Sequence, residues 1–154
     1  EFAMLAPVFF VLLMGIIEVG VMFFANSVLQ KATYDAARLV RTGQVQAQNM
    51  TQAQYRAFVC GEIAPLLSCG SALQIDMRAY NAFTAATYTS PYAANGNLDP
   101  SLSAYQPGVA GNVVLMRTFY QWQLLTPLIG PLLENETNGD HLMTATAAFQ
   151  NEPF

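Results

Sequence analysis

Few residues of this chain carry side chains that commonly do chemistry. The sequence has one histidine, His141, and two cysteines, Cys60 and Cys69. Asp140 stands next to His141, but such a pair at a polar turn is more typical of the entrance to a strand than of catalysis. A zinc site needs about four ligands, and the sequence contains no Gly-x-Ser-x-Gly motif and no phosphate-binding loop. These observations predict a protein that is not an enzyme and that holds no metal or cofactor.

The two cysteines enclose the short sequence GEIAPLLS. This spacing suits a disulfide that closes a helix end onto a turn, and closing a loop of this length stabilises a fold by about 2.5 kcal/mol. Two reduced, buried thiols are the alternative. We expect Cys60 and Cys69 to be joined, because disulfides persist in exported domains.

Two acidic residues, Glu1 and Glu18, stand in an otherwise apolar stretch. An ionisable side chain within a membrane segment indicates a functional role by default. For Glu18 two interpretations are open. It is either a protonated or snorkelling side chain, or a polar contact between packed helices for which Gly15 and Gly20 allow close approach. We assign six residues of this stretch to helix packing during assembly: Glu1, Phe2, Pro7, Gly15, Glu18 and Gly20.

The element that positions these acids is a long helix. The run from Phe2 to Ala25 would be about 36 Å long, whereas the hydrocarbon layer of a membrane is ~30 Å thick. Apolar residues surround its axis, which indicates burial in a membrane rather than in a soluble core. Pro7 removes one backbone donor and is expected to loosen or kink the first turns. The run passes into an amphipathic helix without an Ala-x-Ala site, so we expect it to be retained rather than cleaved as a signal peptide.

Beyond Ala25 the same helix becomes amphipathic and continues to about Gly43, a plausible C-cap. Lys31, Asp35 and Arg38 form a stripe of charges on its exposed face. Its apolar face is expected to enter a core through Leu29, Ala32, Ala36, Leu39 and Val40. We therefore divide the chain into a transmembrane and filament-core half of the helix, residues 1–27, and a globular domain, residues 28–154.

The globular domain is expected to contain a second helix and a first strand. The helix spans 51–67 with Thr51 as its N-cap, and the Gln-rich stretch before it is loop-like. Strict alternation over 72–80 predicts a half-buried strand, with Leu73, Ile75 and Met77 inward and Asp76 on the polar face.

Two further strands complete the predicted sheet. Residues 112–122 are apolar on both faces and should form the central strand, and 141–150 should form the third. Between the strands, 81–111 is a long loop with at most a short helix near 99–104, and 124–133 is a short helical or turn-like cap. The predicted fold class is α+β: a long helix packed on a small antiparallel sheet.

Charge and composition limit the partners and the compartment. The formal net charge is −4, and without a basic patch nucleic acid is not expected as a partner. Lys31, Arg38 and Arg41 follow the apolar run, which by the positive-inside tendency favours a cytoplasmic domain. The expected disulfide favours the opposite side. We expect the domain to be extracytoplasmic.

Residues 1–44, EFAMLAPVFFVLLMGIIEVGVMFFANSVLQKATYDAARLVRTGQ, resemble the N-terminal region of TadE-like proteins, the pilin-like components of bacterial tight-adherence (Tad) systems. The closing LMTATAAFQNEPF looks like the C-terminal strand of the same family. The resemblance implies a pilin-like fold with its anchor in the bacterial inner membrane. It also implies cleavage by a prepilin peptidase and incorporation into a pilus or pseudopilus at the cell surface.

The same resemblance suggests roles for the first residues. Related pilins carry a glutamate near the mature N-terminus followed by an aromatic residue, and Glu1 and Phe2 look like that pair. Glu1 would then pair with the N-terminal amine of a neighbouring subunit. The implied partners are copies of this chain or other pilins, the assembly machinery of the inner membrane and, before assembly, membrane lipid. The alternative is a membrane-tethered extracytoplasmic binding domain that acts as a monomer.

Overall fold

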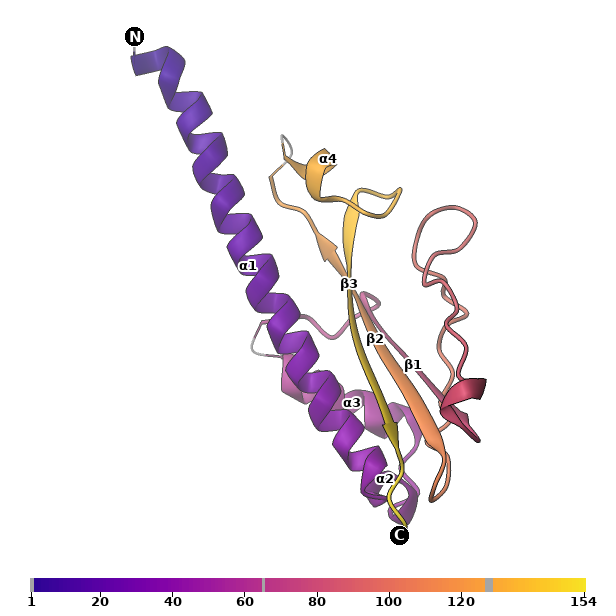
Figure 1. Ribbon diagram of the computed structural model, residues 1–154. Coiled ribbons are helices and arrows are strands. Elements are labelled where there is room, and N and C mark those ends of the chain that lie inside the picture. The colour runs from indigo at the N-terminus through magenta and orange to yellow at the C-terminus, as the bar shows by residue number, and fades with distance from the viewer. Residues whose placement is uncertain (1, 65, 127–128) are drawn as a thin grey trace.

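The computed structural model describes the whole chain except residues 1, 65 and 127–128. Its longest element is a single helix, α1 (Phe2–Arg41), which lies along one face of a small antiparallel sheet and extends well beyond it at the N-terminal end (Figure 1). The predicted α+β class, with a long helix on a small sheet, is confirmed. The helix continues through Pro7, so the expected loosening at this residue does not end the helix.

The sheet contains β1 (Leu73–Tyr80), β2 (Val113–Gln123) and β3 (Asp140–Gln150) in the order β1-β2-β3. Both pairings are antiparallel, and Met116 lies opposite Met77 on one side and Ala147 on the other. β2 is therefore the central strand, as its two apolar faces predict.

The main core lies between the sheet and the C-terminal half of α1. Leu29, Ala32, Ala36 and Val40 have no exposed surface, whereas Leu39 is only half-buried at the edge of the core. The alanines allow the helix to lie close to the strands, since a longer side chain would separate the two layers. The core begins earlier in α1 than the amphipathic pattern indicates, because Met22 and Ala25 also belong to it.

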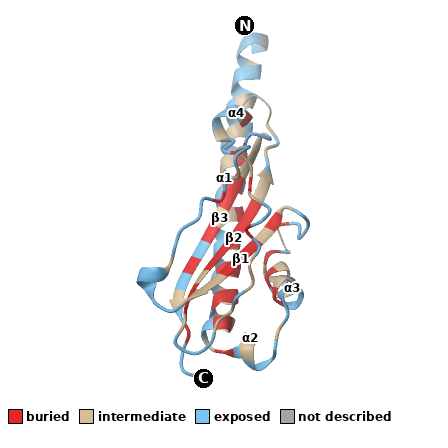
Figure 2. Ribbon diagram, turned by 90° about the vertical axis from the view of Figure 1, so that its right-hand side faces the viewer, coloured by how far each residue is buried: buried red, intermediate tan, exposed pale blue. Residues whose placement is uncertain are grey.

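A second helix, α3 (Gln52–Ile63), completes this layer with Tyr55, Val59 and Ile63. It begins with a capping box in which Thr51 and Gln54 exchange hydrogen bonds between side chain and backbone, as the N-cap prediction requires. Burial raises the pKa of the Tyr55 hydroxyl, which points at the sulfur of Met116. Figure 2 shows the buried residues concentrated on the strands and on the faces of α1 and α3 turned toward them.

The long loop 81–111 covers the opposite face of the sheet, which corrects the prediction of a half-buried first strand (Figure 1). Asp76 is 1% exposed, although the alternation placed it on a polar, solvent-facing side. A small second core formed by Leu98, Leu102, Phe119 and Leu142 lies beneath the loop. The sheet therefore has a helical layer on one face and a layer of irregular chain on the other.

The loop also protects the open edge of β1. The Met77 amide donates to the carbonyl of Ala104, and the Gln106 amide donates to the carbonyl of Met77, at 2.8 and 2.9 Å. This short parallel bridge occupies backbone groups that could otherwise pair with another chain.

Helical segments within the connections differ partly from those predicted. The short helix expected near 99–104 is a turn held by Asp99, whose carboxylate accepts from the amide of Ser101. A single 3-10 turn, η1 (Phe83–Ala85), forms earlier in the loop. The Gln-rich stretch expected as a loop contains α2 (Gln44–Ala47), whereas the expected cap contains α4 (Gly130–Leu133).

The end of α1 follows the predicted C-cap. Gly43 has a φ of 75°, a left-handed conformation that glycine adopts readily. A Cβ at this position would lie 2.3 Å from the ring of Phe154. Any other residue would therefore displace the C-terminal residue as well as strain the turn.

Candidate functional site

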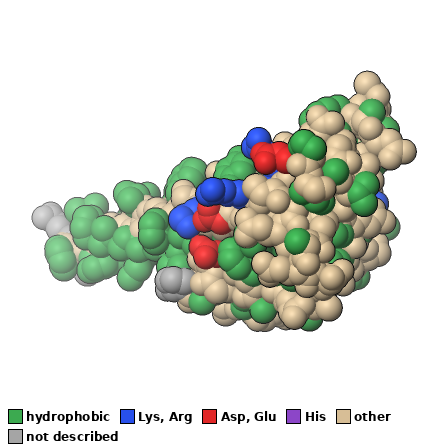
Figure 3. Space-filling view, turned by 90° about the horizontal axis from the view of Figure 1, so that it is seen from below, with side chains coloured by type: hydrophobic (Ala, Val, Ile, Leu, Met, Phe, Trp, Pro, Cys, Tyr) green, Lys and Arg blue, Asp and Glu red, His purple; other side chains and the backbone are tan. Residues whose placement is uncertain are grey.

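The N-terminal half of α1 extends beyond the domain with its apolar side chains exposed. Phe2 and Met4 are each 83% exposed and Ile16 is 72% exposed. We call residues 2–17 the projecting half. Its other large exposed residues are Leu5, Val8, Phe9, Phe10, Leu12, Leu13, Met14 and Ile17. Figure 3 shows hydrophobic side chains covering this end, while the charged side chains visible on that face gather over the domain.

The projecting half has the properties of a membrane anchor rather than of a core helix. The stretch Met4–Arg41 is long and apolar enough to cross a membrane, and only 17% of its most apolar window is buried. A core helix of a soluble protein would have most of that window covered. Phe2 and Pro7 are exposed here, while Glu1, the acid assigned to a contact between subunits, lies outside the described residues.

Glu18 contacts a part of the chain that its position in the sequence does not indicate. Its carboxylate oxygens accept hydrogen bonds from the amides of Leu125 and Thr126, at 2.6 and 3.0 Å, and the residue is 5% exposed. Two backbone donors compensate a buried carboxylate far better than an apolar surface would. Glu18 therefore fixes the part of the chain that follows β2 onto the middle of α1.

Gly15 and Gly20, predicted together as sites of close approach, differ in their surroundings. A Cβ at Gly15 would lie 3.0 Å from Ile129, so this glycine allows the segment around α4 to pack on the helix of the same chain. Among the residues that the structure describes, a Cβ at Gly20 would meet no atom within 4 Å. Of the two, Gly20 is the one whose surface is open to another molecule.

The segment held by Glu18 and Gly15 consists of the described residues 124–126 and 129–133, and we call it the arm. Leu125 and Leu132 of the arm are 79% and 83% exposed. A groove of about 380 Å³ lies between the arm and α1, and its walls are almost entirely apolar. It is lined by Val11, Leu12, Gly15, Ile16, Val19, Ile129, Leu132 and Leu133.

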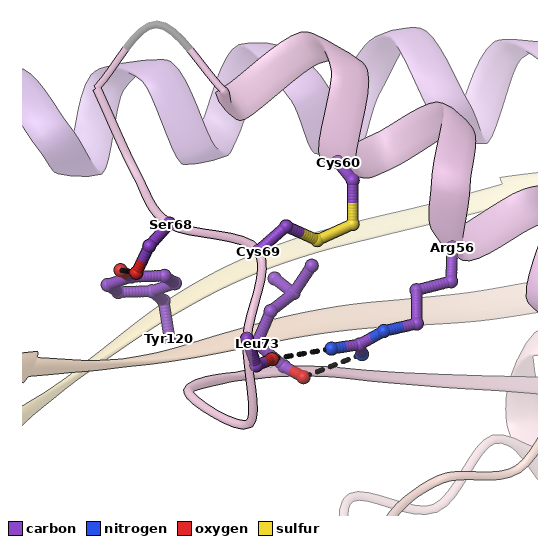
Figure 4. Close-up of a disulfide and its surroundings, with 7 residues drawn as sticks. Arg56, Cys60, Ser68, Cys69, Leu73 and Tyr120 are labelled. Atoms are coloured by element: carbon purple, nitrogen blue, oxygen red, sulfur yellow. Dashed lines mark hydrogen bonds between the residues drawn. A yellow bond between two sulfur atoms is a disulfide. The ribbon is translucent and has the colours of Figure 1, made fainter.

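The disulfide predicted from the cysteine spacing is present. Cys60 near the end of α3 is joined to Cys69 ahead of β1, with their Cα atoms 5.4 Å apart (Figure 4). On the same side, the Arg56 guanidinium donates to the carbonyls of Gly70 and Leu73, at 2.6 and 2.7 Å. The covalent bond and the arginine together hold α3 against the chain that enters the sheet.

Replacing both cysteines with serine is expected to lower the free energy of unfolding by about 2–3 kcal/mol, because the unfolded chain gains the entropy that the closed loop removes. The fold should survive, since the hydrogen bonds of Arg56 remain. Chemical denaturation of the full chain in detergent measures the change, and adding reductant to the unaltered protein should reproduce it. Two free thiols in freshly isolated protein, detected by mass spectrometry without reduction, would refute the bond and weaken the extracytoplasmic assignment.

A buried ion pair on the loop-covered face of the sheet escaped the sequence analysis. Asp76 and Arg117 are directly opposite each other in the register of β1 and β2. One Asp76 oxygen lies 2.7 Å from an Arg117 nitrogen, and both side chains are 1% exposed. The other oxygen of Asp76 accepts from the amide of Ala104 at 3.1 Å, and Arg117 donates to the carbonyl of Thr89 at 2.6 Å.

Aromatic rings from the loop and from β2 surround the guanidinium of Arg117. The Arg117 guanidinium lies 5.4 Å from the ring of Tyr88 and 5.3 Å from that of Phe119, which is cation–π range. The hydroxyl of Tyr105, whose pKa is raised by burial, donates to the carbonyl of Met50. Tyr88 and Tyr105 thus help to hold the loop against its own domain. Arg117 is the only charged residue of β2, and a charge in a largely apolar central strand was the signal in the sequence that a buried partner was needed.

His141, the only histidine, has a structural contact. Its Nδ1 lies 2.6 Å from the carbonyl of Leu133, so the ring joins the start of β3 to the end of α4. Across the described residues, no group of three or more His, Cys, Asp or Glu side chains could hold a metal ion.

Comparison with known protein families gives a match that falls on the helix that carries the projecting half. Residues 1–38 match the family described as TadE-like protein. The resemblance seen at the N-terminus is thereby confirmed, whereas the closing residues 142–154 lie outside the match and their resemblance stays a prediction. No curated protein matches the chain. No solved structure matches it either.

Proposed function

We propose that this chain, whose N-terminal segment matches the TadE-like family, is a structural pilin-like subunit of a bacterial Tad system. In this proposal residues 1–27 anchor the subunit in the inner membrane and later form part of a filament core. Residues 28–154 form an extracytoplasmic domain. The subunit assembles with copies of itself or with other pilins into a pilus or pseudopilus that serves adhesion or secretion.

The observation that supports this proposal most directly is the exposed apolar surface of the projecting half. Leaving the large apolar side chains of the projecting half in water would cost on the order of tens of kcal/mol. Lipid can cover this surface while the subunit is anchored. Once a subunit leaves the membrane, only other apolar helices can replace the lipid, so the core of a filament would be a bundle of such helices.

The distribution of apolar residues suits a bundle better than a dimer. They surround the helix axis from Phe2 to Ile17, so contacts can form on several sides at once. Gly20 adds an open position at which another backbone can approach closely. Processing by a prepilin peptidase and contacts with the inner-membrane assembly machinery are further parts of the proposal, and they rest on the family match.

Gly20→Leu is expected to abolish or strongly reduce filament formation while the domain stays folded. The new side chain meets nothing within the subunit but would hold a neighbouring helix away. Electron microscopy of sheared surface material and immunoblotting of the same fraction measure the loss, in cells that express only the variant.

Gly61→Leu is the matched control. It introduces the same side chain into a helix at a position equally free of neighbours, but in α3 rather than α1, and it should leave filaments intact. If the Gly20→Leu protein assembles normally, no neighbouring helix approaches α1 closely at Gly20. If cells that express the unaltered chain carry it only as a membrane-bound monomer, the tethered binding domain becomes the better interpretation.

A further inference from the structure

We propose that the arm is a second membrane-contacting element, which places the side chains of Leu125 and Leu132 among lipid acyl chains beside α1. The inference rests on the membrane anchor of the proposed function. It adds to that anchor the residues of the arm, which lie more than 100 positions after Glu18 in the chain. The occupant of the arm's outer surface in the anchored subunit is lipid.

The composition of the arm is that of a membrane-inserted segment. The stretch from Leu124 to Leu133 reads LLTPLIGPLL, in which six of ten residues are Leu or Ile and none is charged. Single exposed leucines are common on soluble proteins. Here, however, Leu132 borders the apolar groove shared with Leu12 and Ile16 of α1, so its surface continues that of the anchor.

The depth of the arm follows from its attachment to α1. Glu18 and Gly15 hold the arm level with the middle of the apolar run. Nearer the domain, Phe23 and Phe24 are still 70% and 62% exposed. If the membrane covers Phe24, the level of Glu18 lies about 9 Å deeper, at ~1.5 Å of rise per residue. A membrane that covers the exposed phenylalanines therefore also reaches the arm.

Backbone groups that enter hydrocarbon must have partners, and five amides of the arm have them. The amides of Leu125 and Thr126 donate to Glu18. Those of Ile129 and Gly130 donate to the carbonyl of Thr126, and that of Leu132 to the carbonyl of Ile129. Glu18 then has a specific role in an apolar segment, because it satisfies two donors of a non-helical chain at membrane depth.

The test uses the fact that Trp122 is the only tryptophan. In a Trp122→Phe background, a single tryptophan is introduced by Leu132→Trp or Leu125→Trp. The full chain is then reconstituted in phosphatidylcholine and phosphatidylglycerol vesicles with or without dibrominated acyl chains. Phe10→Trp on the projecting half is the positive control. Val109→Trp is the negative control, since Val109 is 66% exposed and precedes β2, whereas the arm follows it.

We expect brominated lipid to quench the Leu125→Trp and Leu132→Trp proteins nearly as strongly as Phe10→Trp, with Val109→Trp unaffected. Quenching of Phe10→Trp alone would overturn the role of the arm and leave the anchor intact. Absence of quenching in all four proteins would overturn both. A third outcome would also overturn the proposal: Leu132→Trp emission shifts to the blue without being quenched, and the shift depends on the protein-to-lipid ratio. The occupant of the arm's outer surface would then be a second copy of the chain rather than lipid.

Discussion

Asp76→Ala is expected to lower the free energy of unfolding by about 3–5 kcal/mol, because it leaves Arg117 as a buried charge without its carboxylate. The substitution also removes the acceptor of the Ala104 amide, so the loop 81–111 should loosen over the sheet. Denaturation of the full chain in detergent measures the stability. Hydrogen exchange at residues 98–106 reports on the loop.

Asp35→Ala is the matched control for this prediction. Asp35 pairs with Lys31 at 2.6 Å on the surface of α1, where the hydrogen bond to Asp35 raises the pKa of Lys31. Because both side chains are substantially exposed, solvent screens this pair, and its removal should change the free energy of unfolding far less than Asp76→Ala does. If both substitutions lowered the free energy of unfolding equally, burial would not be the reason that the Asp76–Arg117 pair contributes to stability.

Glu1→Ala is expected to leave the domain folded and inserted in the membrane but to reduce incorporation into filaments severely. The resemblance to related pilins implies that Glu1 would pair with the N-terminal amine of a neighbour, so its loss would remove a contact made only during assembly. The ratio of sheared filament protein to cell-bound protein measures the effect.

The control for Glu1 is Glu152→Ala. Glu152 pairs with Arg41 at the opposite end of α1, and about half of its side chain is exposed, so removing this acid should not change filament yield. Normal yield from Glu1→Ala, at a normal protein level, would reject the role assigned to Glu1.

Local regularities of the sequence were sufficient to predict most of the elements. Apolar residues on all sides indicated the projecting half, and helical spacing indicated Leu29, Ala32 and Ala36 as core residues. A two-residue alternation indicated β1, and apolar residues on both faces indicated β2 as the central strand. The Thr51 cap and the Cys60–Cys69 disulfide depend on residues close together in the chain. Such interactions can be predicted because short separations leave few possible geometries.

The roles of the buried acids were decided only by the tertiary structure. Alternation shows which face of a strand Asp76 occupies, but not that a loop without periodicity covers this face. Glu136, in a polar turn, likewise is 4% exposed and accepts from the amide of Leu98. Each of the buried acids Glu18, Asp76 and Glu136 binds a backbone amide of irregular chain far away in sequence. No periodicity encodes such a partner.

The two glycines of α1 show the same contrast between what one segment predicts and what distant segments decide. The residue pattern alone predicts a long apolar helix with small residues at Gly15 and Gly20. Only the fold decided that Gly15 is approached by Ile129 and that Gly20 remains open. The physical reason is that helical periodicity depends on the residues of one segment, whereas the surroundings of a side chain depend on where distant segments pack once the whole core has formed.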